Sequence, residues 1–220
     1  METCRPRIDA CSPVREPATC GFLAMSPLTH FLASWSLAEI AGLDERDKAV
    51  VTWVGTAPDL DGFGAITDTL AQVLGCGEPA LYERFHHVLL HGLGGSLLLP
   101  AVGLAFSRRR GRTFLLGVAA VHLHLACDLV GSRGVTADQI WPVRYLGPFS
   151  EALTASWSGQ WPLNGWPNIL FSIGLMAFVM ARAATAGHSP VRLFSARADA
   201  AFISAAKARW QQWRQWRRRP

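Results

Sequence analysis

Charged residues and paired cysteines are both scarce in this sequence. Charged side chains make up 17% of the 220 residues, whereas apolar side chains make up 50%. This balance excludes a disordered chain and is unusual for a soluble domain. The five cysteines form no CxxC pair, so they predict neither a disulfide scaffold nor a thiolate metal site. The composition therefore favours a membrane protein with one sizeable core.

The first 24 residues lack both a regular hydrophobic period and the long apolar core of a signal peptide. They are rich in proline and arginine and contain Cys4, Cys11 and Cys20. We therefore predict three parts. Residues 1–24 form a disordered extension, residues 25–187 a membrane-embedded helical domain, and residues 188–220 a basic amphipathic tail.

Five apolar segments follow the extension, and three of them are long enough to cross a bilayer. About 20 helical residues cover the hydrocarbon core. The segments at 85–106, 113–130 and 166–183 meet this length, whereas those at 31–43 and 49–57 are shorter. The sequence thus predicts an all-α fold, an integral membrane helical bundle with about three full spans and two shorter helices. We expect residues 131–165 to form a polar connection.

Basic residues predict the orientation of these segments. They gather in the loop Arg108–Arg112 and in the tail, where Trp210, Trp213 and Trp216 recur every three residues, as in an interfacial helix. The positive-inside rule makes both regions cytoplasmic. If the charged turn Asp44–Lys48 also faces inward, the chain is multi-pass with a cytoplasmic C-terminus.

Histidine and aspartate residues cluster at the segment ends that this path brings to the outer face. Such groups beside apolar helices cost free energy unless they are paired or bind a metal. His124 and Asp128 are four residues apart and share a helix face, which suits two ligands of one metal but also a simple side-chain pair. The predicted metal ligands are His30, Asp59, His86, His91, His124 and Asp128.

Imidazole and carboxylate groups without a thiolate suit zinc, with manganese or iron as alternatives. A divalent cation with an open coordination position activates water near neutral pH, so metal-assisted hydrolysis is the expected chemistry. Asp59 and Asp61 are the candidate catalytic residues, because one of them can accept the proton of the attacking water. Which of the two is the base and which a ligand stays open.

The motifs together resemble the YdjM-like membrane-bound metal-dependent hydrolases, also called LexA-binding inner-membrane-associated hydrolases. The resemblance covers residues 25–150 and follows the order of that family's motifs. Its elements are Thr29-His30, the glycine-led Pro58-Asp59-Leu60-Asp61, the pair His86 and His91, the His124-to-Asp128 spacing and Trp141-Pro142. Where the family usually has HRxxTHS, this chain has His87, Leu90 and Gly92 in place of the arginine, the threonine and the serine.

The resemblance implies a helical hydrolase in the bacterial inner membrane, and the path predicted from the basic residues puts its site on the outer face. The ligand order also looks like that of zinc-dependent phospholipase C and single-strand nucleases, although their HxxxE motif is absent. That second similarity implies hydrolysis of a small-molecule or lipid phosphoester by a metal-activated water.

The alternative function is that of a non-catalytic inner-membrane protein. In that case residues 190–220 would bind a protein partner or anionic membrane lipids. Binding of nucleic acid by the tail is disfavoured, because a basic flank is the ordinary anchor of a membrane protein. A metal or proton carrier would need ligands throughout the depth of the bilayer, and the predicted path places them at one level.

Overall fold

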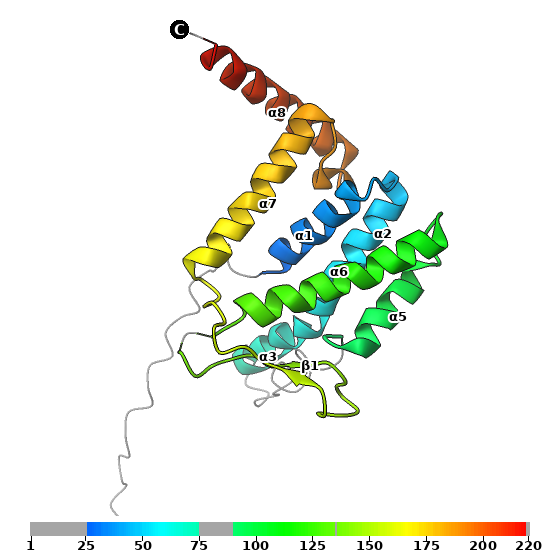
Figure 1. The fold of residues 1–220 in the computed structure, drawn as a ribbon, viewed down its shortest axis with the longest axis vertical. Coiled ribbons are helices and arrows are strands. Elements are labelled where there is room, and N and C mark those ends of the chain that lie inside the picture. Colours follow the sequence, from blue (N-terminus) through cyan, green and yellow to red (C-terminus); the bar gives the residue numbers. More distant parts are fainter. Residues whose placement is uncertain (1–25, 75–89, 135, 219–220) are drawn as a thin grey trace, which may run out of the picture.

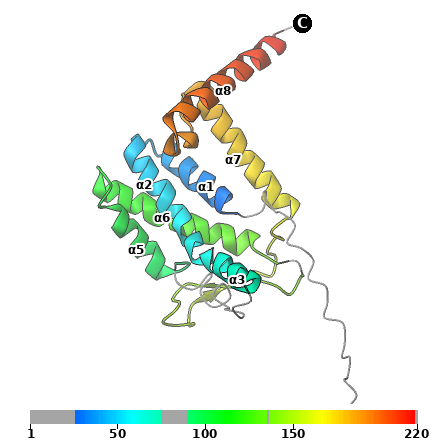
Figure 2. The ribbon, with the colours of Figure 1, turned by 180° about the vertical axis from the view of Figure 1, so that it is seen from behind.

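The computed structural model describes residues 26–74, 90–134 and 136–218, and most of these residues are helical. The helices are α1 (Pro27–Ile40), α2 (Glu45–Thr56), α3 (Gly64–Val73), α5 (Leu93–Gly103), α6 (Arg110–Gly131), α7 (Trp166–Thr185) and α8 (Ala196–Trp216), with 3₁₀ turns η1 (Ala57–Phe63) and η2 (Pro190–Leu193). Helices α1, α2, α5 and α6 pack together, α7 lies against α1, and α8 projects from the end of α7 (Figures 1 and 2).

The short helices α1 and α2 form an antiparallel hairpin. The side chain of Ser26 caps α1, which is followed by Gly42 at a positive φ of 64°. Asp44 caps α2 by accepting hydrogen bonds from the backbone N–H groups of Arg46 and Asp47. The sequence predicts a charged turn over Asp44–Lys48, but all of it beyond Asp44 is helical. Asp47 and Lys48 are buried there, because Asp47 accepts hydrogen bonds from the backbone of the loop before α6 and Lys48 pairs with Glu39.

Two of the described helices, α6 with 22 residues and α7 with 20, are long and apolar enough to cross a membrane. The predicted span over 85–106 differs, because α5 has 11 residues, or about 16 Å. The chain bends at Leu90–Gly92, and a side chain at Gly95 would lie 2.0 Å from the carbonyl oxygen of Leu90. This tight turn brings His91 into the bundle at the expense of a continuous helix.

The polar connection over 131–165 contains a two-stranded antiparallel ribbon of β1 (Val143–Arg144) and β2 (Thr154–Ala155). Two buried amide side chains hold this region together. Gln160 exchanges hydrogen bonds with both backbone groups of Trp141. Asn168 donates to the carbonyl oxygen of Gly131, which joins the start of α7 to the end of α6.

A buried carboxylate ties three helices together at the end of the bundle opposite to Ser26. Glu39 on α1 lies 2.5 Å from Nζ of Lys48 on α2 and 2.6 Å from Nη2 of Arg182 on α7. His188 donates from Nδ1 to the same carboxylate at 3.0 Å. Because the side chain of Glu39 is 3% exposed, its charge depends on these three partners rather than on water.

The partners also decide the ionisation of this group. Burial raises the pKa of Glu39, but hydrogen bonds from Lys48, His188 and Arg182 outweigh burial and lower the pKa from 4.5 to about 2. A carboxyl whose pKa is lower in the folded than in the unfolded chain stabilises the fold above its unfolded pKa. That stabilisation is lost as the pH falls from about 4.5 to about 2.

We predict that Glu39→Gln destabilises the protein at neutral pH by about 3–5 kcal/mol, since it takes the carboxylate of Glu39 away from the buried ammonium of Lys48. The variant should also lose less stability than the wild type between pH 4.5 and 2. Thermal unfolding in detergent across this range measures both effects. Glu151→Gln is the control, because Glu151 is 81% exposed. Equal pH profiles of Glu39→Gln and wild type would contradict the assignment.

Candidate metal centre

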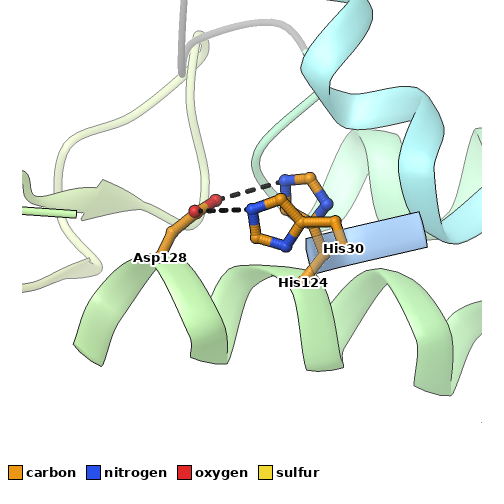
Figure 3. A group of neighbouring side chains, drawn as sticks. All are labelled: His30, His124 and Asp128. Carbon is orange, nitrogen blue, oxygen red and sulfur yellow. Dashed lines mark ion pairs between the residues drawn. The ribbon is translucent and has the colours of Figure 1, made fainter. Parts of the chain in front are cut away.

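Histidine and aspartate side chains from four elements meet at the other end of the bundle. His30 lies in the first turn of α1, Asp59 in η1, and His91 just before α5, whereas His124 and Asp128 are on α6. Figure 3 shows His30 and His124 next to the carboxylate of Asp128. These five side chains are called the His/Asp cluster below.

Asp128 is the centre of the His/Asp cluster. Its Oδ1 lies 3.2 Å from Nε2 of His30, and its Oδ2 lies 3.2 Å from Nε2 of His124 and 3.6 Å from Nε2 of His91. Ser132, one turn later on α6, donates a hydrogen bond to Oδ1 at 3.0 Å. The buried Oδ2 receives no hydrogen bond in the described part of the chain. Oδ1 is therefore held by Ser132 beside His30, and Oδ2 faces the imidazoles of His91 and His124.

The orientation of His124 follows from its contact with Gly55. Nδ1 of His124 lies 2.9 Å from the carbonyl oxygen of Gly55. A carbonyl oxygen can only accept, so Nδ1 carries the proton and donates. In the neutral ring the lone pair is then on Nε2, which points to Asp128, to His91 and to Oδ1 of Asp59 at 3.6 Å.

His91 is oriented in the same way by a carboxylate. Its Nδ1 lies 2.9 Å from Oδ2 of Asp61, so Nδ1 donates and Nε2 keeps its lone pair. The Nε2 atoms of His91 and His124 are only 3.2 Å apart. Two lone pairs at this distance, next to a buried carboxylate, need a cation or a proton between them. The donor set therefore fits a bound metal ion.

Two overlapping groups in the described residues could hold a metal ion, His30 with His124 and Asp128, and Asp59 with His91 and His124. Within each group the ligand atoms lie within 4.8 Å of one another. Both groups use His124, whose Nε2 has a single lone pair for one cation. We therefore treat the five side chains as one centre. His30 stacks on His124 with ring centroids 3.7 Å apart, and its buried Nδ1 has no hydrogen-bond partner among the described residues.

The remaining sequence candidates have different positions. Asp61 contacts the ring of His91 and belongs to neither group. His86 lies outside the described residues. His122, two residues before His124, points away from the cluster and bonds to the hydroxyl of Tyr145 at 2.9 Å and to the carbonyl oxygen of Val118. Sequence reasoning missed the roles of Ser132 and of the Gly55 carbonyl, although the four-residue spacing from Asp128 to Ser132 is a usable signal.

The model of one protein family, described as YdjM inner membrane protein, matches residues 25–210 of the chain. The chain belongs to this family. Its membership and the two apolar helices α6 and α7 agree on an inner-membrane location. The YdjM match includes all five residues of the His/Asp cluster and extends into α8. No curated protein and no solved structure matches the chain.

Within this YdjM protein, Gly55 lets α2 approach its neighbours closely enough for its carbonyl to reach His124. A side chain there would place Cβ 2.8 Å from Cβ of Ala120 on α6 and 2.9 Å from Cβ of Ser34 on α1. Both contacts are shorter than packed atoms allow, so any larger residue must push the three helices apart.

We predict that Gly55→Ala lowers the free energy of unfolding by about 1–3 kcal/mol, the usual cost of overpacking. Thermal unfolding in detergent measures the change. Gly111→Ala is the matched control, because Gly111 is an exposed helical glycine on α6 with no atom within 4 Å of its Cβ position. A loss of stability in the control as large as in Gly55→Ala would contradict the packing explanation.

Proposed function

We propose that this protein is a membrane-bound, metal-dependent hydrolase of phosphoester substrates, with the His/Asp cluster as its metal centre. One observation carries the proposal. Nε2 of His91 and His124, Oδ2 of Asp128 and Oδ1 of Asp59 converge, while the N–H groups of both imidazoles point outward to Asp61 and to the Gly55 carbonyl. Lone pairs that face each other in a buried site suit a divalent cation, with zinc, manganese or iron as candidates.

A bound cation of this kind supplies positive charge that favours the ionisation of a nearby water and polarises a phosphoester. The residues of the chain divide the other tasks. His124 and His91 are held as neutral ligands by Gly55 and Asp61. Asp128, positioned by Ser132, provides the negative charge that balances the cation.

Asp59 is the residue to which we assign the proton of the attacking water. Its side chain is 16% exposed and is the most accessible of the cluster's ion-paired groups, whereas Asp61 is 1% exposed. Oδ2 of Asp59 receives no hydrogen bond from the described residues. Asp61 acts as a positioning residue, because its carboxylate fixes the ring of His91.

The distribution of basic residues supports a site at the outer face. The basic residues Arg108–Arg112, which lie just before α6 and in its first turn, and the projecting helix α8 are at the Glu39 end of the bundle, opposite to the His/Asp cluster (Figure 1). By the positive-inside rule that end is cytoplasmic, which leaves the cluster at the periplasmic level.

We predict that wild-type protein purified in detergent carries about one transition-metal ion per chain, because the His/Asp cluster forms one centre. His124→Ala should lose the metal and all hydrolysis of generic phosphoesters. Elemental analysis and a phosphoesterase assay measure the two properties. His122→Ala is the control on the same helix and should keep both, since His122 bonds to Tyr145.

Two further observations would decide against a metal centre. One is wild-type protein without stoichiometric metal after reconstitution with zinc, manganese or iron. The other is equal metal content in the His124→Ala and His122→Ala variants. Added metal should also raise the unfolding temperature of the wild type but not that of His124→Ala, which separates metal loss from misfolding.

We predict different outcomes for the two aspartates of η1. Asp59→Asn should keep the metal and lower kcat by about 10²–10⁴-fold, the usual contribution of a general base. Asp61→Asn should weaken metal affinity by about 10–100-fold, because the ring of His91 loses its carboxylate. Metal titration and steady-state kinetics distinguish the two. Loss of metal from Asp59→Asn would make Asp59 a ligand instead of the base.

A second candidate function rests on α8. Few of its residues are buried, and Trp213 and Trp216 are 44% and 70% exposed. Such a basic, tryptophan-bearing helix suits anionic lipid or an acidic protein partner at the cytoplasmic surface. Removal of residues 196–220, which include α8, should weaken binding to anionic vesicles and leave metal content unchanged. Vesicle binding that is unchanged after this truncation would show that α8 is not the lipid-binding element.

A further inference from the structure

An apolar groove of about 430 Å³ lies between α2 and α5. Arg46 at one end supplies the one charged side chain among the described lining residues. Gly103 opposes Val50 in it, and a side chain at Gly103 would lie 2.9 Å from Cγ1 of Val50. The main apolar lining residues are Trp53, Val54 and Ala57 on one side and Leu99, Val102 and Phe106 on the other.

The groove follows α2 from Arg46 to Ala57. Eleven residues of helix correspond to about 16 Å. This length is about half of the ~30 Å hydrocarbon core, or one leaflet of a bilayer. Ala57 directly precedes Pro58 and Asp59, so one end of the groove adjoins the His/Asp cluster.

The depth of the cluster in the bundle also bears on the kind of substrate. His124 lies seven residues before the end of α6, which places it about 10 Å along the helix from that end. A lipid is a substrate that suits a site at this depth in a membrane. Phe106 and Val102, which line the groove, are 61% and 56% exposed, and Leu98 beside them is 58% exposed. The groove is therefore continuous with an apolar surface suited to contact lipid tails.

The lining of the groove selects one kind of occupant. It offers almost no hydrogen-bonding group, so a polar ligand would have no partners there. At its far end the guanidinium of Arg46 donates from Nε to the carbonyl oxygen of Phe106 at 2.5 Å. The charged side chain of Arg46 therefore closes this end of the groove to an apolar chain that enters beside Ala57.

We propose that the groove between α2 and α5 binds the acyl chain of a phospholipid whose phosphoester lies at the His/Asp cluster. This inference rests on the proposed function for the position of the headgroup. The substrate class is then an outer-leaflet lipid phosphoester, and the groove sets the chain length that the site accepts.

The first test is photo-crosslinking of the full chain in detergent with a phospholipid that carries a diazirine near the end of its acyl chain. Labels should concentrate on α2 and α5 near Arg46 and Ala49, and an excess of unlabelled long-chain lipid should prevent them. The His124→Ala variant should be labelled equally, because the groove is independent of the metal. Labels spread evenly over the exposed faces of α6 and α7 would show ordinary surrounding lipid and overturn the proposal.

The second test changes the length of the groove. Ala49 lines it about 12 Å from Ala57, so Ala49→Phe should block its far part. The variant should bind and hydrolyse long-chain phospholipids at least about tenfold less well, since each buried methylene contributes up to about fourfold to affinity. Short-chain analogues should be unaffected. Leu115→Phe is the control, because Leu115 is 69% exposed on α6 and does not line the groove.

The two tests separate this inference from the proposed function. Specific labelling of α2 and α5 without any hydrolysis would retain the lipid site and refute the hydrolase. Metal-dependent hydrolysis with no effect of Ala49→Phe on chain-length preference would retain the hydrolase and refute the lipid site.

Discussion

The buried carboxylate of Asp128 among three imidazoles is the constraint on which the rest of the structure depends. A full negative charge at this position, more than 90% buried, is tolerable only with positive charge or several donors nearby. Ser132 supplies one donor, and the Nε2 atoms of His30, His91 and His124 lie around the carboxylate, where a shared cation or proton would balance its charge. His30 lies on α1 and His91 in the turn before α5, whereas His124 and Ser132 belong to the same helix as Asp128, so the carboxylate specifies how α1, α6 and the turn before α5 pack.

The need to bring imidazoles to this carboxylate also explains features that weaken regular structure. The close approach at Gly55 places a backbone carbonyl against His124, and the bend at Leu90–Gly92 delivers His91 at the expense of helix length. At the opposite end Glu39 uses a different solution, because it is neutralised by cations of the chain itself, Lys48 and Arg182. The bundle thus has one end whose charges are balanced internally and one end whose lone pairs remain available.

The sequence predicts much of the fold and also predicts that the residues of the His/Asp cluster lie close together. The apolar lengths predict α6 and α7, and the four-residue spacing of His124 and Asp128 predicts their common face. The bend before α5 was not predictable, because Leu90 to Gly103 has the composition of one apolar segment and the bend is fixed by contacts with distant residues, those of His91 with Asp61 and of the Leu93 N–H with the Tyr145 carbonyl. The helical start of α2 was missed since Asp47 and Lys48 look solvated until their partners, Arg108, Arg109 and Glu39, are known. The roles of Gly55 and Asp61 depend on which ring atom each faces, and spacing carries no such information.

The shortness of α1 and α2 has a consequence for the membrane around the protein. With 14 and 12 residues, these helices are about 21 Å and 18 Å long, whereas the hydrocarbon core is about 30 Å thick. A bilayer that meets such a surface would thin locally to match it. Headgroups and water would then move towards the ends of these two helices at which His30 and Asp59 lie. The proposed hydrolysis would need no channel for water, because the thinned bilayer would bring water to the cluster.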